Sequence, residues 1–388
     1  MKNFKKKLTL LRRRILFFWL WPLAFNIYKS KPINENLVLF AFSKNYTEMP
    51  DNMIGIYNFL KGRGFDCRIM QSPQNPIKRI LFDFKFQRLY AQCKCVFITD
   101  NFDPVYAHQP KRGTKVIQLW HACGAFKKWG YSTLDLPWGG KREDMLRFPM
   151  HNTYTDVFVS SEAVIPCYAE AFRCSERKVK AFGTPRTDVY FDKDFVAAQR
   201  AELLKNFPEI GDRKIILYAP TFRGNSPEQA YNENPLDYEK LKESLGDDYA
   251  LILKLHPFTA KKFGLTDEEK EKYGDFVFDG SKSLKIETAL CAADILIADY
   301  SSLIFEYSLL NKPMLFYAFD LEQYEHDRSF YFDYKSFVPG KIVVNNDEII
   351  QAVRNGDFRS DRIPSFREKF MGACDGESVK RIAEYAVM

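Results

Sequence analysis

The clearest structural signal in the chain is Ile295-Leu296-Ile297-Ala298-Asp299-Tyr300-Ser301-Ser302-Leu303-Ile304-Phe305-Glu306. Its opening apolar run is typical of a buried strand, and the residues after Ser302 predict a helix. A helix that begins at small hydroxyl residues presents unpaired N–H groups, and these favour a bound phosphate. In the alternative interpretation, Asp299 or Ser301 is only the N-cap of that helix.

Apolar strands and helical patterns alternate along most of the chain. The first series predicts strands at 37–42, 95–100, 115–120, 156–160 and 178–182, with helices at 53–60 and 162–172. After a helical pattern at 193–206, the second series predicts strands at 214–218, 249–255, 276–278, 294–298 and 313–317, and the residues from 347 onward look helical. Almost wholly apolar strands that are separated by helices indicate parallel sheets covered on both faces.

The predicted fold class is therefore α/β, with two doubly wound parallel-sheet domains facing a central cleft. A length of 388 residues fits two domains, and 46% hydrophobic residues supply two cores. We place the boundary at 207/208. None of the eight cysteines forms a C-x-x-C pair, so we expect reduced, structural thiols and a cytosolic compartment. No His/Cys cluster has the spacing of zinc ligands, and we expect no metal.

The positive charge is concentrated at the N-terminus. Residues 1–31 hold six Lys and three Arg with no acidic residue, so residues 32–388 carry a net −2 within the total of +7. This balance argues against a nucleic-acid-binding globular part. The segment instead favours an anionic membrane surface, because Lys5-Lys6-Lys7 and Arg12-Arg13-Arg14 precede 14 uncharged residues, 15–28, that are rich in Trp, Phe and Leu.

Two other interpretations of the N-terminal segment stay open. Its uncharged run contains Pro22 and is shorter than the ~20 residues of a spanning helix. One alternative is a signal peptide, although no small-residue cleavage site follows the run. The other is a helix packed on the core.

Two histidines directly follow predicted strands. His121 follows the strand that ends at Trp120, where an imidazole is suited to act as a general base. His256 follows a buried strand that Pro257 prevents from continuing. Its ring is suited to donate to, or protonate, a phosphate, and Lys254 shares its face. The alternatives are a loop histidine held by backbone hydrogen bonds for His121, and a structural His-Pro turn for His256.

A second pair of segments offers groups for binding phosphate. Thr221 and Arg223 follow the first strand of the second half, and a guanidinium can clamp phosphate oxygens in bidentate fashion. The alternative is a turn with an ordinary surface arginine. In the opening stretch, Asp299 is suited to orient a histidine or a ribose, and the two serines that follow it are suited to a diphosphate. Glu306 lies one turn farther on and is suited to ribose hydroxyls, or is a solvated helix residue.

The polar residues at the strand ends predict one shared binding cleft. Ligands of open parallel sheets bind beyond the carboxyl ends of the strands, and the combined cations and hydroxyls suit a nucleotide diphosphate. The sequence contains neither G-x-x-x-x-G-K-[ST] nor G-x-G-x-x-G, which excludes a P-loop NTPase and a dinucleotide-dependent dehydrogenase. No acidic pair for a bound metal follows a strand, so protein cations and helix dipoles would neutralise the charge.

Five motifs together resemble the CDP-glycerol:poly(glycerophosphate) glycerophosphotransferase family of teichoic acid synthesis. They are Leu119-Trp120-His121 with Lys127-Lys128-Trp129-Gly130, Gly183-Thr184-Pro185-Arg186-Thr187-Asp188, Tyr218-Ala219-Pro220-Thr221-Phe222-Arg223, Leu253-Lys254-Leu255-His256-Pro257, and Ala298-Asp299-Tyr300-Ser301-Ser302 with Phe305-Glu306 and Asn311-Lys312-Pro313. The resemblance extends over roughly residues 36–375. One departure is Ala122-Cys123-Gly124 after Trp-His, where the family usually has glycine at once.

The resemblance implies a GT-B architecture and a peripheral enzyme at the cytoplasmic face of the cell membrane. A membrane-associating segment (1–31) would precede an acceptor-binding domain (32–207) and a nucleotide-donor-binding domain with C-terminal helices (208–388). The enzyme would move an alditol phosphate, with glycerol phosphate expected first, from a CDP-alditol to a hydroxyl of an undecaprenyl-diphosphate-linked teichoic acid or capsule precursor. CMP would be released, and no cofactor is implied.

The resemblance also implies roles for particular residues. His121 and His256 would be catalytic, with His121 as the base. The donor would contact Thr221, Arg223, Lys254, Asp299, Ser301, Ser302 and Glu306, and the acceptor side would include Lys127, Lys128 and Arg186. The alternative functions are a ribitol-phosphate transferase of the same family, a GT-B glycosyltransferase that uses a nucleotide sugar, and a non-catalytic membrane-bound binding protein.

Overall fold

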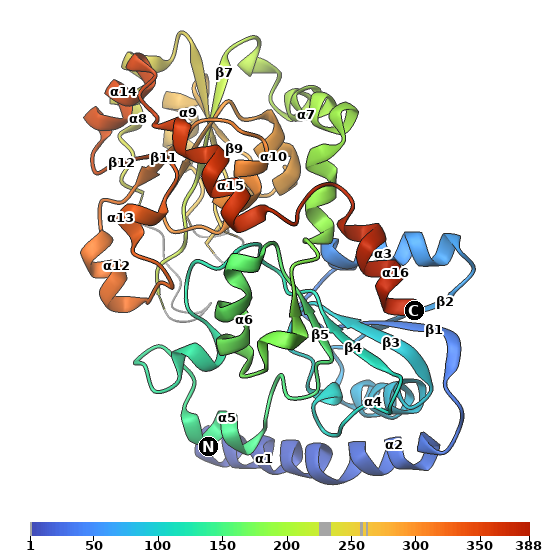
Figure 1. Cartoon of the computed structure of the whole chain (residues 1–388). Coiled ribbons are helices and arrows are strands. Elements are labelled where there is room, and N and C mark those ends of the chain that lie inside the picture. The colour runs from blue at the N-terminus through green and yellow to red at the C-terminus, as the bar shows by residue number, and fades with distance from the viewer. Residues whose placement is uncertain (1, 225–233, 257–258, 261–262) are drawn as a thin grey trace. The chain divides into compact units, whose positions relative to one another are not determined.

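The chain folds into two compact units, each built on one parallel sheet (Figure 1). The structure, a computed structural model, describes residues 2–224, 234–256, 259–260 and 263–388. Unit 1 comprises residues 1–122, 129–188 and 372–388, and unit 2 comprises residues 123–128 and 189–371. The predicted α/β class with two parallel sheets is confirmed.

The sheet of unit 1 has the strand order β2-β1-β3-β4-β5-β6, and all of its pairs are parallel. Its strands are β1 (Asn34–Phe42), β2 (Asp66–Gln71), β3 (Cys93–Ile98), β4 (Lys115–Gln118), β5 (Asp156–Phe158) and β6 (Val179–Lys180). Its helices are α1 (Lys2–Ile15), α2 (Trp21–Lys29), α3 (Asp51–Gly62), α4 (Pro76–Tyr90), α5 (Arg142–Arg147), α6 (Ile165–Phe172) and α16 (Ser378–Val387). The order of the strands reverses between β1 and β3.

The sheet of unit 2 has the order β12-β11-β10-β7-β8-β9, again with parallel pairs. Its strands are β7 (Lys214–Ala219), β8 (Tyr249–Leu253), β9 (Val277–Asp279), β10 (Ile295–Ala298), β11 (Met314–Tyr317) and β12 (Lys341–Val343). Its helices are α7 (Lys193–Asn206), α8 (Tyr238–Leu245), α9 (Asp267–Tyr273), α10 (Ile286–Ala292), α11 (Leu303–Leu309), α12 (Leu321–Asp327), α13 (Tyr334–Phe337), α14 (Asn346–Asn355) and α15 (Ile363–Met371).

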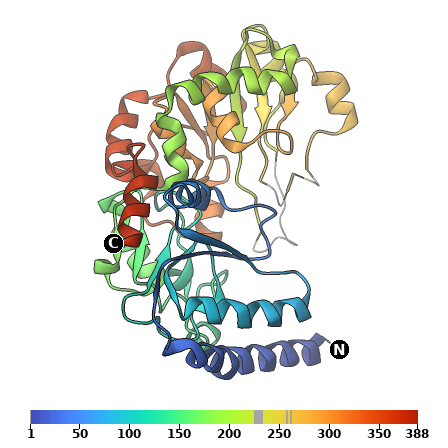
Figure 2. The same ribbon diagram turned by 90° about the vertical axis from the view of Figure 1, so that its right-hand side faces the viewer.

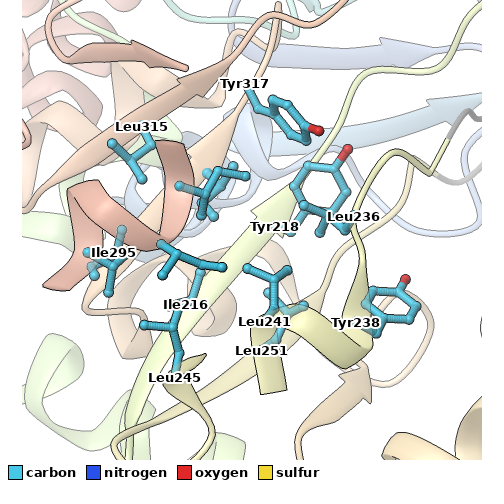
Figure 3. Packing of buried hydrophobic residues seen from close by; sticks show 14 of the residues in the cluster. Ile216, Tyr218, Leu236, Tyr238, Leu241, Leu245, Leu251, Ile295, Leu315 and Tyr317 are labelled. Atoms are coloured by element: carbon cyan, nitrogen blue, oxygen red, sulfur yellow. The ribbon is translucent and has the colours of Figure 1, made fainter. Parts of the chain in front are cut away.

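Side chains from the middle strands form the core of unit 2. Figure 3 shows Ile216 and Tyr218 of β7, Ile295 of β10 and Leu315 of β11 packed together with the apolar face of α8. Burial of apolar side chains makes the main favourable contribution to the free energy of packing such a sheet against its helices. None of the eight cysteines, all of which lie in the described part of the chain, forms a disulfide.

The division into units differs from the predicted boundary at 207/208. Helix α7 packs against α10 of unit 2, where Thr288 donates a hydrogen bond to the Gln199 amide (2.8 Å). The polar break after α7 is therefore a connection inside unit 2. At the other end, Ile382 and Ala386 of α16 are fully buried in the core of unit 1, against α3. The C-terminal helix thus belongs to unit 1, and not with the second sheet.

The N-terminal segment is a helical rod that packs on unit 1. Helices α1 and α2 are joined by a π-helical turn at Leu16–Leu20, and Figures 1 and 2 show the rod beside α4. Its inner side buries Phe17, Trp21 and Phe25. The expected alternative of a helix packed on the core is therefore found, although it leaves a second apolar face exposed. Among the described residues, no helix has both the length and the apolar character that crossing a bilayer requires.

Candidate active site

The strand order of unit 2 reverses between β7 and β10, which lie side by side with Ala298 opposite Ala219. Open parallel sheets bind ligands beyond the carboxyl ends of the strands at such a reversal. Thr221 follows β7 there, and Asp299 follows β10. The residues predicted from two distant stretches of sequence are therefore brought together at the expected edge of the sheet.

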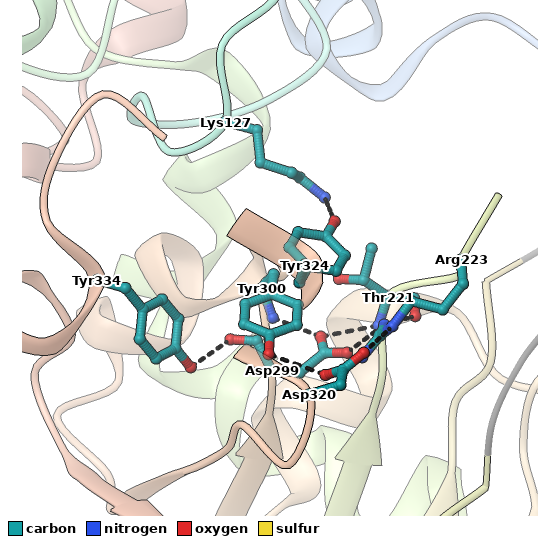
Figure 4. Close-up of polar contacts among 8 residues, drawn as sticks. All are labelled: Lys127, Thr221, Arg223, Asp299, Tyr300, Asp320, Tyr324 and Tyr334. Atoms are coloured by element: carbon teal, nitrogen blue, oxygen red, sulfur yellow. Dashed lines mark hydrogen bonds and ion pairs between the residues drawn. The ribbon is translucent and has the colours of Figure 1, made fainter. Parts of the chain in front are cut away.

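Asp299 joins the ends of these two strands. Its Oδ1 accepts hydrogen bonds from the backbone N–H groups of Thr221 (2.8 Å) and Tyr300 (2.5 Å), and its Oδ2 accepts from Nη1 of Arg223 (2.8 Å; Figure 4). Its backbone carbonyl accepts from the hydroxyl of Tyr334 (3.0 Å). Asp299 is therefore not the N-cap of α11, and its carboxylate is already used in joining two loops.

Arg223 is bound by two carboxylates. Its Nε and Nη2 donate to the two oxygens of Asp320 (2.7 and 3.0 Å), and its Nη1 donates to both Asp299 and the Thr221 carbonyl. Burial works to lower the pKa of Arg223, but the two carboxylates outweigh it and raise that pKa. The ring of Tyr300 lies against the guanidinium, and its hydroxyl donates to Asp320 (2.9 Å).

These contacts differ from what was expected of Arg223. The side chain is only 8% exposed, so it is not an ordinary surface arginine. Four of its five N–H donors are directed at protein oxygens, so it is not open for a bidentate phosphate clamp either. In contrast, the buried hydroxyl of Thr221 has no hydrogen-bond partner among the described residues. A buried hydroxyl without a partner is costly in a finished core but useful at a ligand site.

The serines of the opening stretch lie at the start of α11, both half-buried. Ser301 Oγ accepts a hydrogen bond from the N–H of Leu303 (3.3 Å), the first residue of α11, but Ser301 stands one residue before the N-cap position. Ser302 occupies the N-cap position and makes no side-chain cap bond. Glu306 is 1% exposed, so the alternative of a solvated helix residue is wrong.

Lys254, which was expected to contact the donor, is held by backbone carbonyls. Its Nζ donates to the carbonyls of Gly280, Ser281 and Leu284 (3.3, 3.0 and 2.5 Å). Burial lowers the pKa of Lys254 from its ordinary value, and the charges of Asp279 and Glu287 act against this. The amine therefore fixes the loop after β9.

His256 is half-buried after β8 and its ring lies 4.7 Å, centroid to centroid, from that of Phe222. Burial lowers the pKa of His256 to about 4, and the positive charge of Lys127 acts in the same direction. The ring is therefore neutral at pH 7. Pro257, which was expected to stop the strand, lies outside the described residues.

Lys127 and Lys128 belong to unit 2, although they were expected on the acceptor side. The N–H of Lys128 donates to the Ser329 carbonyl (2.8 Å), and Lys127 pairs with Phe330 in an isolated bridge. Nζ of Lys127 lies 3.3 Å from the hydroxyl of Tyr324 (Figure 4). Lys127 therefore lies with the residues around His256, near enough to affect its pKa.

His121 and Arg186 belong to unit 1. His121 follows β4 and keeps solvent-exposed surface, but surrounding protein atoms lower its pKa, while the negative charge of Asp100 works to raise it. Nη1 of Arg186 donates to the backbone carbonyl of His121 (3.0 Å). A neutral, partly open imidazole is the form that can accept a proton.

Some residues of these sites were missed in the sequence. Asp320 lies three positions after β11, and an acidic residue so close to the end of a strand was the signal that could have found it. Tyr300 stands inside the motif at 298–302.

A cavity of about 500 Å³ between α13 and α15 is lined by Phe332, Phe366 and Arg362, among others, and contains no predicted site residue.

Comparison with known proteins settles the family. The model of the CDP-glycerol:poly(glycerophosphate) glycerophosphotransferase family matches residues 23–387. The chain belongs to this family. It is therefore an enzyme of the alditol-phosphate transferase type, as the motifs implied.

Two curated relatives and one solved structure illustrate the membership. A teichoic acid ribitol-phosphate primase of Bacillus spizizenii is 36% identical over 375 residues, which cover 91% of each chain. A teichoic acid poly(ribitol-phosphate) polymerase of the same organism is 34% identical over 372 residues, and this chain spans 59% of its length. The wall teichoic acid polymerase TagF superposes with a TM-score of 0.75 at 21% identity over 99% of this chain and 97% of that one. The predicted GT-B-like fold is confirmed.

We expect Arg223→Met to destabilise unit 2 strongly. The substitution leaves the buried Asp299 and the half-buried Asp320 without their shared cation, and the loss of one partner of a buried ion pair typically costs about 3–5 kcal/mol. Urea denaturation with hydrogen exchange read on peptides of β7, β10 and β11 measures the loss. The control is Arg367→Met, on an exposed face of α15. Equal stability of the two variants would show that the carboxylates do not depend on Arg223.

We expect the ring of His256 to titrate with a midpoint near pH 4. Its pKa lies below the ordinary value of about 6.5, so the unfolded chain binds this proton first as the pH falls. The contribution of His256 to stability is therefore complete above pH 6.5 and is lost as the pH falls towards 4. Histidine NMR signals, assigned with His256→Gln, measure the midpoint, and a value near 6.5 contradicts the burial described.

Proposed function

We propose that the chain transfers an alditol phosphate from a CDP-alditol to a hydroxyl of an undecaprenyl-diphosphate-linked acceptor and releases CMP. Glycerol phosphate is the first candidate for the transferred group, because the family is described by its use of CDP-glycerol. Ribitol phosphate is the second, and the observation in its favour is the 34–36% identity to two ribitol-phosphate enzymes. Unit 2 would bind the donor and unit 1 the acceptor.

The observation that carries the proposal is the pair of loops at the β7/β10 reversal. Thr221 presents a buried hydroxyl that has no protein partner among the described residues, and the two serines before α11 stand on the adjoining loop. We assign these three residues to binding of the diphosphate. His256 would donate a further hydrogen bond to it. Arg223, Asp299 and Lys254 then act as positioning residues, because their polar groups are committed to protein partners.

Lys127 fits the donor site better than the acceptor site. After burial, its positive charge is the second cause of the lowered pKa of His256, and its amine contacts the Tyr324 hydroxyl. An anionic diphosphate that binds beside both groups would favour the protonated ring, because opposite charges a few ångströms apart stabilise each other. His256 would then gain a proton when the donor binds, and could supply it to the departing CMP. Glu306 stays a candidate for the ribose.

The proposed reaction is an in-line transfer. The acceptor oxygen forms a bond to the β-phosphorus of the donor, and the bond from that phosphorus to the bridging oxygen breaks. CMP leaves with the bonding electron pair, and His121 takes the proton of the acceptor hydroxyl. Most of the rate in such transfers comes from positioning and from stabilising charge on the phosphoryl oxygens.

We expect His121→Gln to lower CMP release by at least about 100-fold, the size typical of a lost general base. The donor dissociation constant should change little, because the base contacts the acceptor. Purified enzyme is incubated with a lipid-linked acceptor and CDP-glycerol, CDP-ribitol or UDP-N-acetylglucosamine, and the freed nucleotide is measured. Thr221→Val is the complementary variant, and it should weaken donor binding.

The donor panel also separates the alternatives. Release of UDP alone would make the chain a glycosyltransferase, and turnover of no donor would make it a binding protein. Near-normal CMP release by His121→Gln would remove that residue from the mechanism. An unchanged donor affinity in Thr221→Val would remove the β7/β10 loops from the donor site.

We further propose that the N-terminal rod attaches unit 1 to the cytoplasmic face of an anionic membrane. Beyond its buried side, the rod exposes an apolar stripe at 8, 11, 15, 19, 23 and 27, in which Trp19 is 74% and Ile27 is 62% exposed. Lys7, Arg12 and Arg14 are exposed on the same rod. Such a helix can lie in the headgroup region with its apolar side inserted. The neighbouring α4 adds exposed Ile77 and Leu81.

We expect Trp19→Ser with Ile27→Ser to weaken binding to vesicles that contain phosphatidylglycerol by at least about tenfold, since two large apolar side chains are lost from the interface. Co-sedimentation measures the partition coefficient. The matched control is Phe191→Ser with Val344→Ser, which removes two exposed apolar side chains elsewhere. Equal loss in both double variants would refute a dedicated membrane stripe.

A further inference from the structure

Trp120, the residue before His121, has an unusual backbone. Its φ of +54° lies in the left-handed region, which a residue with a bulky side chain rarely adopts. Its ring is packed between Trp129 and Phe172, with centroid distances of 5.9 and 5.2 Å. A left-handed residue turns the following peptide away from the direction of the strand, and so determines where His121 projects from the end of β4. Strained backbone of this kind persists only where its surroundings enforce it.

The carbonyl of Trp120 is held by two side chains from different elements. Nδ2 of Asn52, in the first turn of α3, donates to it at 2.6 Å, and Oγ1 of Thr99, directly after β3, also donates to it at 2.6 Å. Both side chains are buried. Two donors on one carbonyl satisfy both of its lone pairs, so the peptide cannot rotate towards an extended conformation without losing both bonds.

Asn52 and Thr99 also affect His121 through contacts other than those with the Trp120 carbonyl. Oδ1 of Asn52 accepts a hydrogen bond from the N–H of Arg186 (3.2 Å), and Arg186 in turn donates to the His121 carbonyl (3.0 Å). The backbone of Thr99 also lies close enough to the imidazole of His121 to act on its pKa, which it works to raise.

We propose that Asn52 and Thr99 are positioning residues for catalysis, which hold the Trp120–His121 peptide in its left-handed turn and so aim the imidazole at the acceptor hydroxyl. The inference rests on the proposed role of His121 as the base. It adds two buried residues, from α3 and from the end of β3, that lie outside all five motifs.

Thr99→Val tests the proposal, because valine keeps the shape of threonine and removes only the hydroxyl. We expect kcat for CMP release to fall about tenfold, as for the loss of one net hydrogen bond, with the KM for the CDP-alditol unchanged. Thr99→Ser restores the hydroxyl and should restore kcat. The matched control is Thr153→Val, at a buried threonine of the same unit whose hydroxyl has no partner among the described residues.

Asn52→Ala and the double variant supply a second measurement. Because both side chains hold one carbonyl, the losses should be non-additive, and the double variant should deviate from the product of the single effects. The imidazole signals of His121 in NMR spectra should move in Thr99→Val and Asn52→Ala, and should stay in place in Thr153→Val. A residue that only stabilises the fold would lower the melting temperature without moving those signals or the pH profile of kcat.

The outcomes separate this inference from the proposed function. If His121→Gln is inactive while Thr99→Val keeps both its kcat and its His121 signals, the positioning role is refuted and the base stands. If His121→Gln stays active, the base is refuted, and the ring signals alone then decide whether Asn52 and Thr99 position the imidazole. Unchanged signals in both variants overturn the inference in either case.

Discussion

The site in unit 2 depends on one buried guanidinium between two carboxylates. Arg223 follows β7, Asp299 follows β10 and Asp320 follows β11, so a single cation joins the ends of three adjacent strands. Removing these charges from water is costly, and only the paired, hydrogen-bonded arrangement offsets that cost. The loops therefore have one favourable arrangement, and the hydroxyl of Thr221 is presented by a rigid support.

Unit 1 achieves a similar rigidity with neutral groups. An amide and a hydroxyl hold the peptide before His121, while the charges of Asp100 and Arg186 act in opposite directions on the pKa of the ring. Both site histidines have a pKa below the ordinary value because burial disfavours the charged ring. Under the proposed function, the chain uses charge to build the donor-binding loops and neutral hydrogen bonds to aim the base.

The central strands and the edge strands β6 and β9 were readable from the sequence, whereas the edge strands β2 and β12 were not. β7 and β10 are apolar because both faces are covered, whereas β2 carries Asp66 and Arg68 at the edge of its sheet, and β12 has only three residues. Edge strands tolerate polar residues, so their pattern is weak. The ion pair between Arg223 and Asp320 could not be predicted from the sequence either, because the two residues lie 97 positions apart. Local motifs identified the residues of the candidate site, but they did not show which polar groups would be bound by other parts of the protein.

Translation begins unit 1 before unit 2, but it completes unit 2 before unit 1. Residues 372–388 finish unit 1, although most of that unit is made before any of β7 to β12. The ribosome therefore releases the whole second sheet while α3 still lacks the apolar cover of Ile382 and Ala386. During that interval the apolar side of α3 lacks part of its cover, and exposed apolar surface of this kind favours aggregation. A premature stop codon just before Ser378 would damage the unit that was started first.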